Sequence, residues 1–283
     1  MGVDVSELRG EQGWTELPSE AGSLAELVAG EPANGVYLVA RSWQGGRVLE
    51  LDRHFDRLER SALALGHTLH VPRAALRRQL AARRLVRGWP DVRFRITAIL
   101  DPEPWWRLSL EQASDLPQAL RRDGVACASL AHGGRVQPEI KATAWLHDRA
   151  RLERAANARS DIYETLLTDG AGRILEGVSS NFYAIVQGEL CTAGSGVLAG
   201  IARRIVLEVA SGLLPVRLEA PRLADLGPGC EAFITSATRG VVPVNSIDDR
   251  VFGPPGPWTL RLMQSYDDWL SAHLEPLLPA QAP

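Results

Sequence analysis

Hydrophobic and polar residues follow two different periods along the first hundred residues of the chain. Over 36–43 and 47–51 the pattern favours two strands, and the Gly45-Gly46 pair between them favours a hairpin turn. From 51 to 65, apolar residues recur at spacings of three and four, which predicts a helix, and the glycine that follows is suited to end it. We therefore expect a strand, a hairpin turn, a second strand and a helix in this region.

The same reasoning predicts further strands and helices in the remainder of the chain. The predicted elements are a helix over 73–86, strands over 92–100 and 124–130, a helix over 145–156, strands over 164–169 and 180–186, a helix that opens at Gly200, strands on both sides of a polar turn at 236–239, and a helix over 258–274. Residues 1–33 show no clear period. A weak pattern over 113–122 favours an interdomain linker, so we expect domains at 1–115 and 122–283.

Composition is that of an ordinary globular protein. Of the 283 residues, 45% are hydrophobic and 23% are charged, which is enough apolar material for a substantial core. The formal net charge is −3 and no strongly basic segment occurs, which argues against nucleic acid as a partner. No apolar run approaches the roughly 20 residues that a membrane span needs. The first residues lack the pattern of a signal peptide, so we expect a cytoplasmic protein without a membrane partner.

Cysteine and histidine give no sign of a metal site or a thiol catalyst. Cys127, Cys191 and Cys230 are widely spaced and form no CxxC pair, which favours structural thiols in a reducing compartment. The six histidines show neither an HxxxH nor an HExxH pattern. We therefore predict no metal ligands.

One residue type is used almost never. Lysine and arginine together number 31, and Lys141 is the only lysine, which leaves 31 − 1 = 30 arginines. Lysine can form an imine with an aldehyde when its amine is deprotonated, and arginine cannot. Count alone leaves open the alternative that an arginine-biased composition has left one surface lysine by chance.

A carboxylate downstream of this lysine extends the catalytic hypothesis. Glu176 follows Lys141 by 35 residues and is predicted to lie at a turn between two strands. If the lysine holds pyridoxal phosphate, an anion is needed beside the pyridine nitrogen to keep it protonated, so that the ring can accept electrons from the substrate. Glu176 is the candidate for that anion.

Several motifs in one order resemble a known enzyme family. Lys141 is followed by the segments Tyr163–Gly170 (YETLLTDG) and Leu175–Phe182 (LEGVSSNF). This order resembles the class IV, or fold type IV, pyridoxal phosphate enzymes, from about Gly35 to about Asp248. That family includes branched-chain aminotransferases, D-amino acid aminotransferases, R-selective amine transaminases and 4-amino-4-deoxychorismate lyases. The resemblance implies an α+β, two-domain fold, with a small N-terminal α/β domain and a larger C-terminal domain built on a β-barrel-like sheet core.

The resemblance also implies which residues hold the cofactor phosphate. Arg57 stands in a His-x-x-Arg-Leu block. Taken alone, Arg57 is better explained as part of a solvated helix face shared with Arg53 and Arg60, and the resemblance of the block reverses that preference. The helix that opens at Gly200 has free amides at its start that can receive a phosphate, and LAGIAR resembles the family's Leu-x-Gly-Ile-Thr-Arg. The implied phosphate-binding residues are Arg57, Gly200, Ile201, Ala202, Ser236 and Ala237. Ala202 replaces the usual threonine, so a hydroxyl contact is lost.

Substrate contacts are implied less sharply. The candidates are Tyr37, Arg41, Arg95 and Trp145, with the two arginines proposed for carboxylate recognition. At 31–35 the chain reads EPANG where the family usually has a Tyr-Gly-Asp-Gly-like turn. The identity of the substrate therefore stays open.

Transamination is the preferred activity. We expect a homodimeric enzyme that moves an amino group between an amino acid or amine and a 2-oxo acid through pyridoxal 5'-phosphate bound to Lys141. The first alternative is an aminodeoxychorismate lyase. Such lyases tend to carry aromatic-Thr-Thr-Ala-Arg on the first strand, whereas 37–41 here read YLVAR without the hydroxyl. A non-catalytic protein that binds pyridoxal phosphate is the second alternative.

Overall fold

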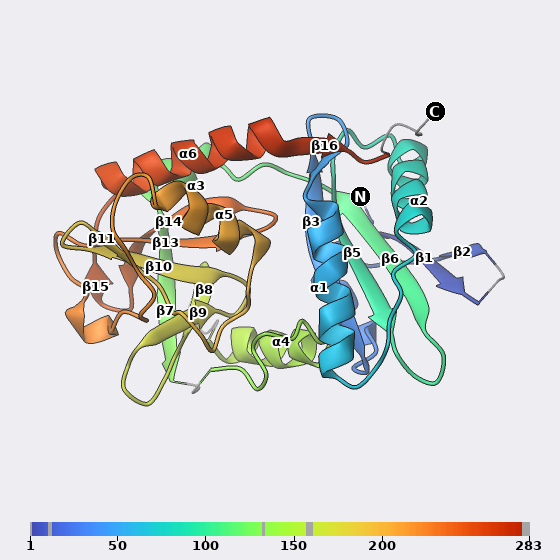
Figure 1. The fold of residues 1–283 in the computed structure, drawn as a ribbon, viewed down its shortest axis with the longest axis horizontal. Helices are drawn as coiled ribbons and strands as arrows, with labels where there is room; N and C mark the ends of the chain where they lie inside the picture. The colour runs from blue at the N-terminus through green and yellow to red at the C-terminus, as the bar shows by residue number, and fades with distance from the viewer. Residues whose placement is uncertain (1, 11–12, 132–133, 157–160, 279–283) are drawn as a thin grey trace. The chain divides into compact units, whose positions relative to one another are not determined.

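The computed structural model describes residues 2–10, 13–131, 134–156 and 161–278 (Figure 1). They divide into two compact units, and the chain passes between them more than once. The first unit comprises Met1–Ser114, Ile140–Asp148 and His273–Pro283, and the second comprises Asp115–Glu139 and Arg149–Ala272. The lysine segment thus belongs to the first unit. The division into domains at 1–115 and 122–283 stays a prediction.

An antiparallel sheet of seven strands forms the base of the first unit, in the order β16-β4-β3-β5-β6-β1-β2. Its strands are β1 (Asp4–Arg9), β2 (Trp14–Leu17), β3 (Gly35–Trp43), β4 (Arg47–Leu49), β5 (Val92–Ile99), β6 (Trp105–Gln112) and β16 (Leu274–Pro276). The predicted hairpin of β3 and β4 is confirmed, with Gly45 and Gly46 both at positive φ in its turn.

Two helices cover one face of this sheet. They are α1 (Leu51–Ala64) and α2 (Arg73–Val86), and both confirm the predicted positions. The core between helices and sheet contains Phe55 of α1, Leu80 of α2 and Leu38 of β3, all fully buried. Gly66 follows α1 at φ 86°, the left-handed conformation that glycine adopts without strain.

Residues 1–33, which show no clear period in the sequence, add regular structure to the first unit. They form β1, β2 and a 3-10 helix, η1 (Glu26–Gly30). The pattern is obscured because β1 is buried on both faces. Asp4 and Ser6 face α2, where Asp4 pairs with Arg83 at 2.6 Å, whereas Val5 packs on the opposite face with Leu24. Buried polar residues thus alternate with buried apolar ones, and the usual polar and apolar contrast is lost.

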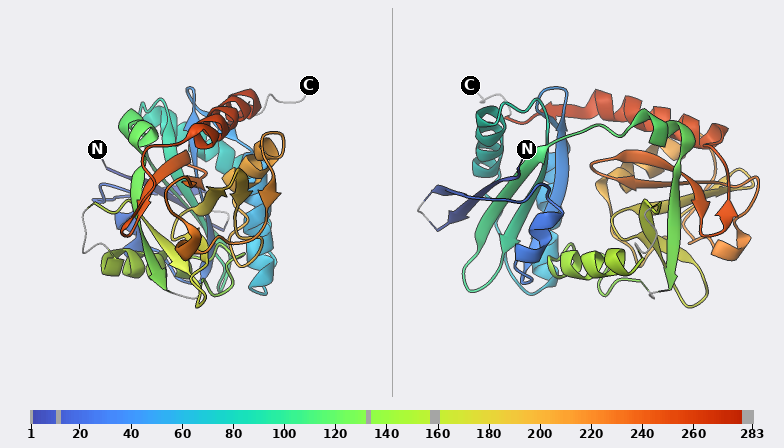
Figure 2. Two further views of the ribbon diagram at one scale, coloured as in Figure 1. Left: turned by 90° about the vertical axis from the view of Figure 1, so that its left-hand side faces the viewer. Right: turned by 180° about the vertical axis from the view of Figure 1, so that it is seen from behind.

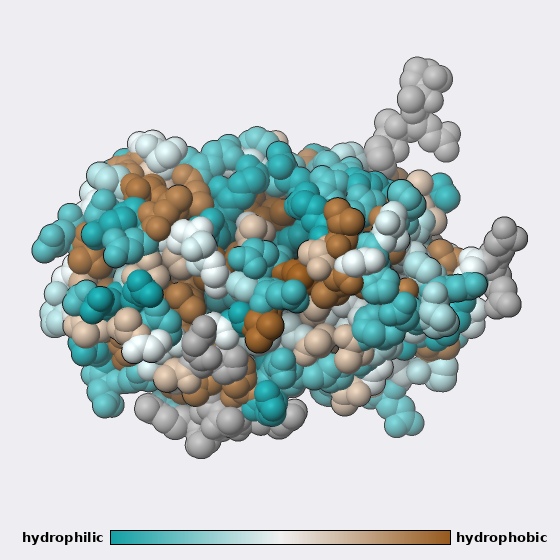
Figure 3. All heavy atoms as spheres, turned by 60° about the horizontal axis from the view of Figure 1, so that its bottom comes forward, coloured by the Kyte–Doolittle hydropathy of each residue, from teal (hydrophilic) through white to brown (hydrophobic). Residues whose placement is uncertain are grey.

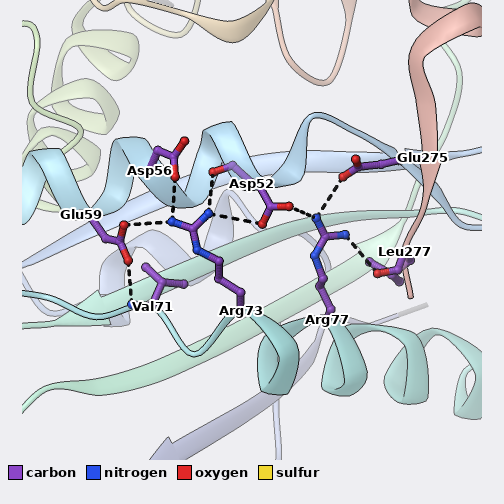
Figure 4. Close-up of polar contacts among 8 residues, drawn as sticks. All are labelled: Asp52, Asp56, Glu59, Val71, Arg73, Arg77, Glu275 and Leu277. Atoms are coloured by element: carbon purple, nitrogen blue, oxygen red, sulfur yellow. Dashed lines mark hydrogen bonds and ion pairs between the residues drawn. The ribbon is translucent and has the colours of Figure 1, made fainter. Parts of the chain in front are cut away.

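Ion pairs join α1 to α2, as Figure 4 shows. The guanidinium of Arg73 on α2 contacts Asp56 at 2.7 Å and Glu59 at 3.0 Å, both on α1. Glu59 also accepts a hydrogen bond from the amide of Val71, just before α2. These contacts fix the turn between the helices.

Arg77, one turn further along α2, ties in the C-terminal strand. Its side chain is buried and contacts Asp52 on α1 and Glu275 in β16, each at 3.0 Å (Figure 4). Its Nη1 donates to the carbonyl of Leu277 at 3.1 Å. One guanidinium therefore joins α2 both to the preceding helix and to the distant C-terminal strand.

The pairings of the second unit close a barrel of six strands. Figures 1 and 2 show this unit from several sides. The barrel strands are β7 (Val125–Ala131), β8 (Glu164–Thr168), β9 (Ile174–Gly177), β10 (Asn181–Val186), β13 (Glu231–Ser236) and β14 (Gly240–Ile247). The pairing of Asn181 with Glu176 joins β10 to β9 and closes the circle. The predicted barrel-like sheet core and the α+β class are confirmed.

Shorter strands and helices complete the chain. The strands β11 (Glu189–Cys191), β12 (Val216–Arg217) and β15 (Arg250–Val251) extend the sheet, and η2 spans Leu223–Asp225. The helices are α3 (Gln118–Asp123), α4 (Ala144–Ala156), α5 (Ile201–Ala210) and α6 (Pro257–His273). The expected linker thus contains a short helix. Cys127, Phe182 and Ile234 lie in the barrel core, and burial raises the pKa of the Cys127 thiol, as expected of a structural cysteine.

Hydrophobic and hydrophilic residues are interspersed on the face that Figure 3 shows. No helix in the described ranges has both the length and the apolar character required to cross a bilayer.

We expect Arg77→Gln to lower the free energy of unfolding by about 1–3 kcal/mol, because a buried guanidinium loses its ion pairs and leaves the Leu277 carbonyl without its donor. Chemical denaturation measures this change. Arg78→Gln is the matched control, since Arg78 is the next residue on α2 and is exposed. Equal effects of the two substitutions would contradict the structural role assigned to Arg77.

Candidate functional site

Backbone hydrogen bonds hold the lysine segment against β3 in the first unit. The carbonyl of Lys141 accepts from the amide of Tyr37 at 2.9 Å, and the amide of Thr143 donates to the carbonyl of Gly35 at 2.8 Å. The amide of Lys141 donates to Ser61 Oγ on α1 at 3.2 Å. Residues 141–143 are thus held by both β3 and α1, which leaves only the side chain of Lys141 to vary in position.

The Lys141 amine lies against an aromatic ring. Its Nζ is 4.8 Å from the ring centroid of Tyr37, and the lysine is half-buried. A cation over a ring face is attracted by the negative charge of the π system. The structure therefore brings together Lys141 and one of the predicted substrate-contacting residues, Tyr37.

Helix α1 supplies a buried arginine and a histidine to the same region. Arg57 is buried, whereas Arg53 and Arg60 on the same helix are exposed, so the alternative of a solvated face is wrong for Arg57. Arg57 Nη2 lies 3.4 Å from Nδ1 of the buried His54. A guanidinium can only donate, so Nδ1 must accept and His54 is neutral, with its proton on Nε2.

The pKa of His54 agrees with this assignment. Burial lowers the pKa well below its ordinary value of 6.5, and the positive charges of Arg57 and Lys141 lower it further. Two cationic side chains therefore act on one imidazole, and the region around His54 is suited to receive an anion.

Arg41 and Arg95 lie on the sheet face opposite α1 and α2. In the pairing of β3 with β5, Val39 lies opposite Arg95. Along their strands Arg41 and Arg95 alternate with core residues, so both arginines point away from the core. The Arg41 guanidinium stacks 3.8 Å from the ring centroid of Trp43 and donates to the carbonyl of Ser114 at 3.2 Å. Arg41 is thus already held by protein groups.

Arg95 has a carboxylate partner that sequence reasoning missed. Its Nη2 lies 2.6 Å from Oε1 of Glu31, whose side chain is fully buried, and its Nη1 donates to the carbonyl of Leu24 at 3.0 Å. Glu31 also contacts Arg107 at 3.4 Å. Glu31 is the first residue of the segment 31–35, which departs from the family pattern. That departure was the sign in the sequence that this segment has contacts of its own. Carboxylate recognition by Arg95 stays a prediction, with one edge of the guanidinium already occupied.

Trp145 is buried near the start of α4, and its amide donates to the carbonyl of Ala142 at 3.1 Å. The tryptophan therefore continues the turn that begins at the lysine. Its contact with substrate stays a prediction.

In the second unit, Glu176 lies inside a strand and not at a turn. The prediction was wrong because β9 is short and pairs with both β8 and β10, so its last residues are held as strand. The carboxylate is buried. Its Oε2 accepts from the amide of Leu198 at 3.0 Å, and Oε1 lies 3.5 Å from Arg135 Nη1. Arg135, also buried, is a further residue that the sequence did not single out.

The start of α5 is an uncapped helix N-terminus, as predicted. Gly200 is the N-cap residue and makes no side-chain capping bond, so a helix end with free amides at Ile201 and Ala202 is available to an anion. A Cβ at Gly200 would overlap Oδ1 of Asn181, whose Nδ2 donates to the carbonyl of Leu198 at 2.9 Å. Asn181 stands in the quoted motif but was not predicted as a site residue, and it positions this helix start.

The two arginines in the first turn of α5 have partners of their own. Arg203 Nη2 donates to the carbonyl of Ala193 at 2.7 Å, and Arg204 pairs with Glu208 one turn further along at 2.6 Å. Their charges are therefore accommodated within the protein, and the helix amides remain the groups that face an incoming anion.

Ser236 ends β13, and Ala237 begins the turn to β14. Thr235 is paired with Asn181, so the end of β13 is joined to the residue that positions the α5 start. The second unit thus brings Glu176, the α5 start and the Ser236 turn together through Asn181. The first unit likewise brings together Lys141, Tyr37 and Arg57. Among the described residues, no three histidine, cysteine, aspartate or glutamate side chains are grouped to hold a metal ion.

The amino-acid sequence is similar to those of known aminotransferases. The family model described as amino-transferase class IV matches residues 35–247. A probable branched-chain-amino-acid aminotransferase from Thermotoga maritima is 33% identical over 115 residues, which are 39% of this chain and 42% of that protein. A D-alanine aminotransferase from Bacillus licheniformis is 29% identical over 245 residues, which are 80% of this chain and 84% of that protein.

Solved structures show the same fold. The PLP-bound form of a hypothetical aminotransferase from Mycobacterium tuberculosis superposes with a TM-score of 0.75 at 20% identity, covering 96% of this chain and 99% of that one. A putative 4-amino-4-deoxychorismate lyase superposes with a TM-score of 0.69 at 28% identity, covering 85% and 92%.

The buried neutral histidine predicts a pH dependence of stability. Below pH 6.5 the unfolded chain takes up a proton at position 54 while the folded protein does not, so stability should fall as pH falls from 7 to 5, by up to about 1.4 kcal/mol per pH unit. His54→Asn should flatten this dependence, because Asn Oδ1 can accept from Arg57 without titrating. Denaturation midpoints across pH 5–7 test this. His70→Asn, at an exposed position, should leave the slope unchanged, and a slope retained in His54→Asn would contradict the assignment.

Proposed function

Because the chain belongs to the class IV aminotransferases, we propose that it transfers an amino group between an amino acid or amine and a 2-oxo acid, with Lys141 as the residue that bonds the cofactor. Enzymes of this class use pyridoxal 5'-phosphate. When bound, this cofactor supplies an aldehyde to which amines attach and a ring that accepts electrons from the substrate's α-carbon. The observation that carries the proposal is the position of Lys141, the chain's only lysine. Its backbone is hydrogen-bonded to β3, and its side chain lies near Tyr37 and Arg57.

The residues present fit such a cofactor. Its phosphate is a dianion or monoanion at neutral pH, and the chain offers the buried guanidinium of Arg57, the uncapped amides of Ile201 and Ala202, and the hydroxyl of Ser236. We assign phosphate binding to these groups, with Gly200 and Ala237 as the backbone positions beside them.

Glu176 is assigned to the ring nitrogen. A carboxylate opposite that nitrogen favours its protonated form. The amide of Leu198 and the guanidinium of Arg135 hold the buried carboxylate of Glu176 in one orientation, so its direction does not depend on solvent. The short contacts between Leu198, Asn181 and Gly200 couple this direction to the helix start that receives the phosphate.

Lys141 is proposed to act twice. Its Nζ would bond the cofactor, and after exchange with the substrate amine the same Nζ would serve as the base that moves the proton at the substrate's α-carbon. The backbone bonds to Tyr37 and Ser61 keep Cα of Lys141 fixed during this exchange, so only the flexible side chain has to move.

Substrate recognition is proposed to involve Tyr37, Arg41, Arg95 and Trp145. The relatives named above make branched-chain amino acids and D-alanine the first amino donors to test. Transamination is favoured over the lyase reaction because the chain lacks a hydroxyl that could assist an elimination. Val39 lies between Tyr37 and Arg41 on the same side of β3, and valine has no hydroxyl. We further propose a cytoplasmic homodimer.

The visible absorption of the purified protein tests the proposal. We expect a band from bound pyridoxal 5'-phosphate that bleaches when an amino donor is added and returns with a 2-oxo acid. Lys141→Ala should abolish bleaching and lower turnover by at least about 10³-fold, since the base and the attachment point are lost together. Glu176→Gln should retain binding but slow turnover. A band that no donor bleaches would favour the binding protein, and elimination products would favour the lyase.

The helix start gives a separate test. Gly200→Ala should weaken pyridoxal 5'-phosphate binding roughly tenfold or more, because the added Cβ meets Asn181 Oδ1 and displaces the amides that face the phosphate. Gly212→Ala, just beyond the other end of α5, is the matched control, because a Cβ there meets no atom closer than 4.0 Å. Titration of the apoprotein measures both affinities, and equal affinities would contradict the role of the α5 start.

A further inference from the structure

Arg239, which the site described so far does not use, donates hydrogen bonds to Ser236, Glu164 and Ser179 from the turn between β13 and β14. Its Nε donates to Ser236 Oγ at 3.0 Å. Its Nη2 donates to Glu164 Oε2 and to Ser179 Oγ, each at 2.9 Å. One side chain therefore contacts the proposed phosphate-binding turn, strand β8 and the turn between β9 and β10.

The acceptors that hold Arg239 are themselves fixed. Glu164 is buried in β8, and its carboxylate accepts from the amide of Ser179 at 3.1 Å and from the hydroxyl of Ser179 at 2.6 Å. The charge of Arg239 is thus balanced by Glu164. The main effect of the Arg239 side chain is therefore to orient the side chains that it contacts. The guanidinium also lies 5.5 Å from the ring centroid of Tyr163, which limits its movement on another side.

The bond to Ser236 decides what the serine hydroxyl can do. A hydroxyl has one proton and two lone pairs, and Arg239 Nε occupies one of the lone pairs. An arginine has no lone pair to receive the serine proton, so that proton is left to donate to a different acceptor. A donor with a full positive charge also polarises the hydroxyl and strengthens the bond that it donates.

A second consequence concerns spacing. Ser179 lies between Glu176 and Asn181, in the turn that leads out of the strand of the proposed ring-nitrogen carboxylate. By binding Ser179 and Ser236 at once, Arg239 fixes the separation between the β9–β10 turn and the β13–β14 turn. Glu176, near the end of β9, and the Ser236 turn are proposed to contact opposite ends of one cofactor.

We propose that Arg239 is a positioning residue for the cofactor phosphate, which directs the Ser236 hydroxyl as a donor to a phosphate oxygen while Glu164 and Ser179 hold the guanidinium in place. The proposal rests on the proposed function, because the anion that receives the Ser236 proton is taken to be the phosphate of pyridoxal 5'-phosphate. Arg239 itself acts through Ser236.

The test compares two ligands that differ only in the phosphate. Apoprotein is titrated with pyridoxal 5'-phosphate and with pyridoxal, and the visible band gives a dissociation constant for each. Arg239→Met should raise the constant for pyridoxal 5'-phosphate roughly tenfold to a hundredfold, the range expected for a charge-assisted hydrogen bond. The constant for pyridoxal should stay within about twofold of wild type, since that ligand lacks the group affected.

Ser236→Ala and the double variant complete a thermodynamic cycle. If Arg239 acts through Ser236, adding Arg239→Met to Ser236→Ala should weaken binding little further. Full multiplication of the two single effects would overturn the proposal, as would equal weakening of both ligands by Arg239→Met. Arg261→Met, at an exposed arginine on α6, is the control and should bind both ligands as wild type does.

Arg239→Lys covers the case in which the methionine variant does not fold. Lysine keeps a positive charge opposite Glu164 but cannot donate from two separated nitrogens at once. It should melt near the wild-type temperature yet bind pyridoxal 5'-phosphate more weakly, and wild-type affinity would overturn the proposal. Failure of the proposed function has a different result. Wild-type protein that binds neither ligand would rule out the cofactor itself, and wild-type protein whose band no amino donor bleaches would rule out amino transfer while leaving both dissociation constants measurable.

Discussion

The backbone hydrogen bonds between residues 141–143 and the first residues of β3 are the constraint on which the lysine half of the site depends. They make this short segment a neighbour of β3, and the bond to Ser61 ties it to α1 as well. The Cα of Lys141 is therefore fixed as firmly as a residue in a paired strand, and only the flexible four-carbon side chain can move the amine. Tyr37, Arg57 and His54 surround it because they lie on the same two elements.

In the second unit, closure of the barrel fixes the position of Glu176. The pairing of Asn181 with Glu176 completes the circle of strands and also sets the carboxylate beside the loop that leads into α5. Asn181 then bonds that loop and lies too close to Gly200 for any side chain at position 200. Asn181 and Glu176 therefore both close the barrel and place the proposed cofactor contacts.

The arginine-rich composition is accommodated by pairing buried and half-buried guanidinium groups with carboxylates or carbonyls. Arg77 joins α2 to β16, Arg95 faces Glu31, and Arg239 faces Glu164. A buried charge is costly unless it is paired and hydrogen-bonded. Arginine suits such sites because its planar group donates in several directions at once. The consequence for function is that the predicted carboxylate-binding arginines, Arg41 and Arg95, are already engaged by protein groups.

The sequence by itself determined the helices α1 and α2, the barrel strands other than β9, the helix start at Gly200 and the conspicuous single lysine, because each leaves a local signal in periodicity, glycine placement or composition. Only the tertiary structure decided that Glu176 lies within a strand, that 1–33 form strands and a 3-10 helix, and that Glu31, Arg135, Asn181 and Arg239 hold the proposed site residues. These features arise from pairings between residues distant in the chain. A buried polar residue whose partner lies far away in sequence has the same local signature as a solvated one, so only the folded arrangement distinguishes the two.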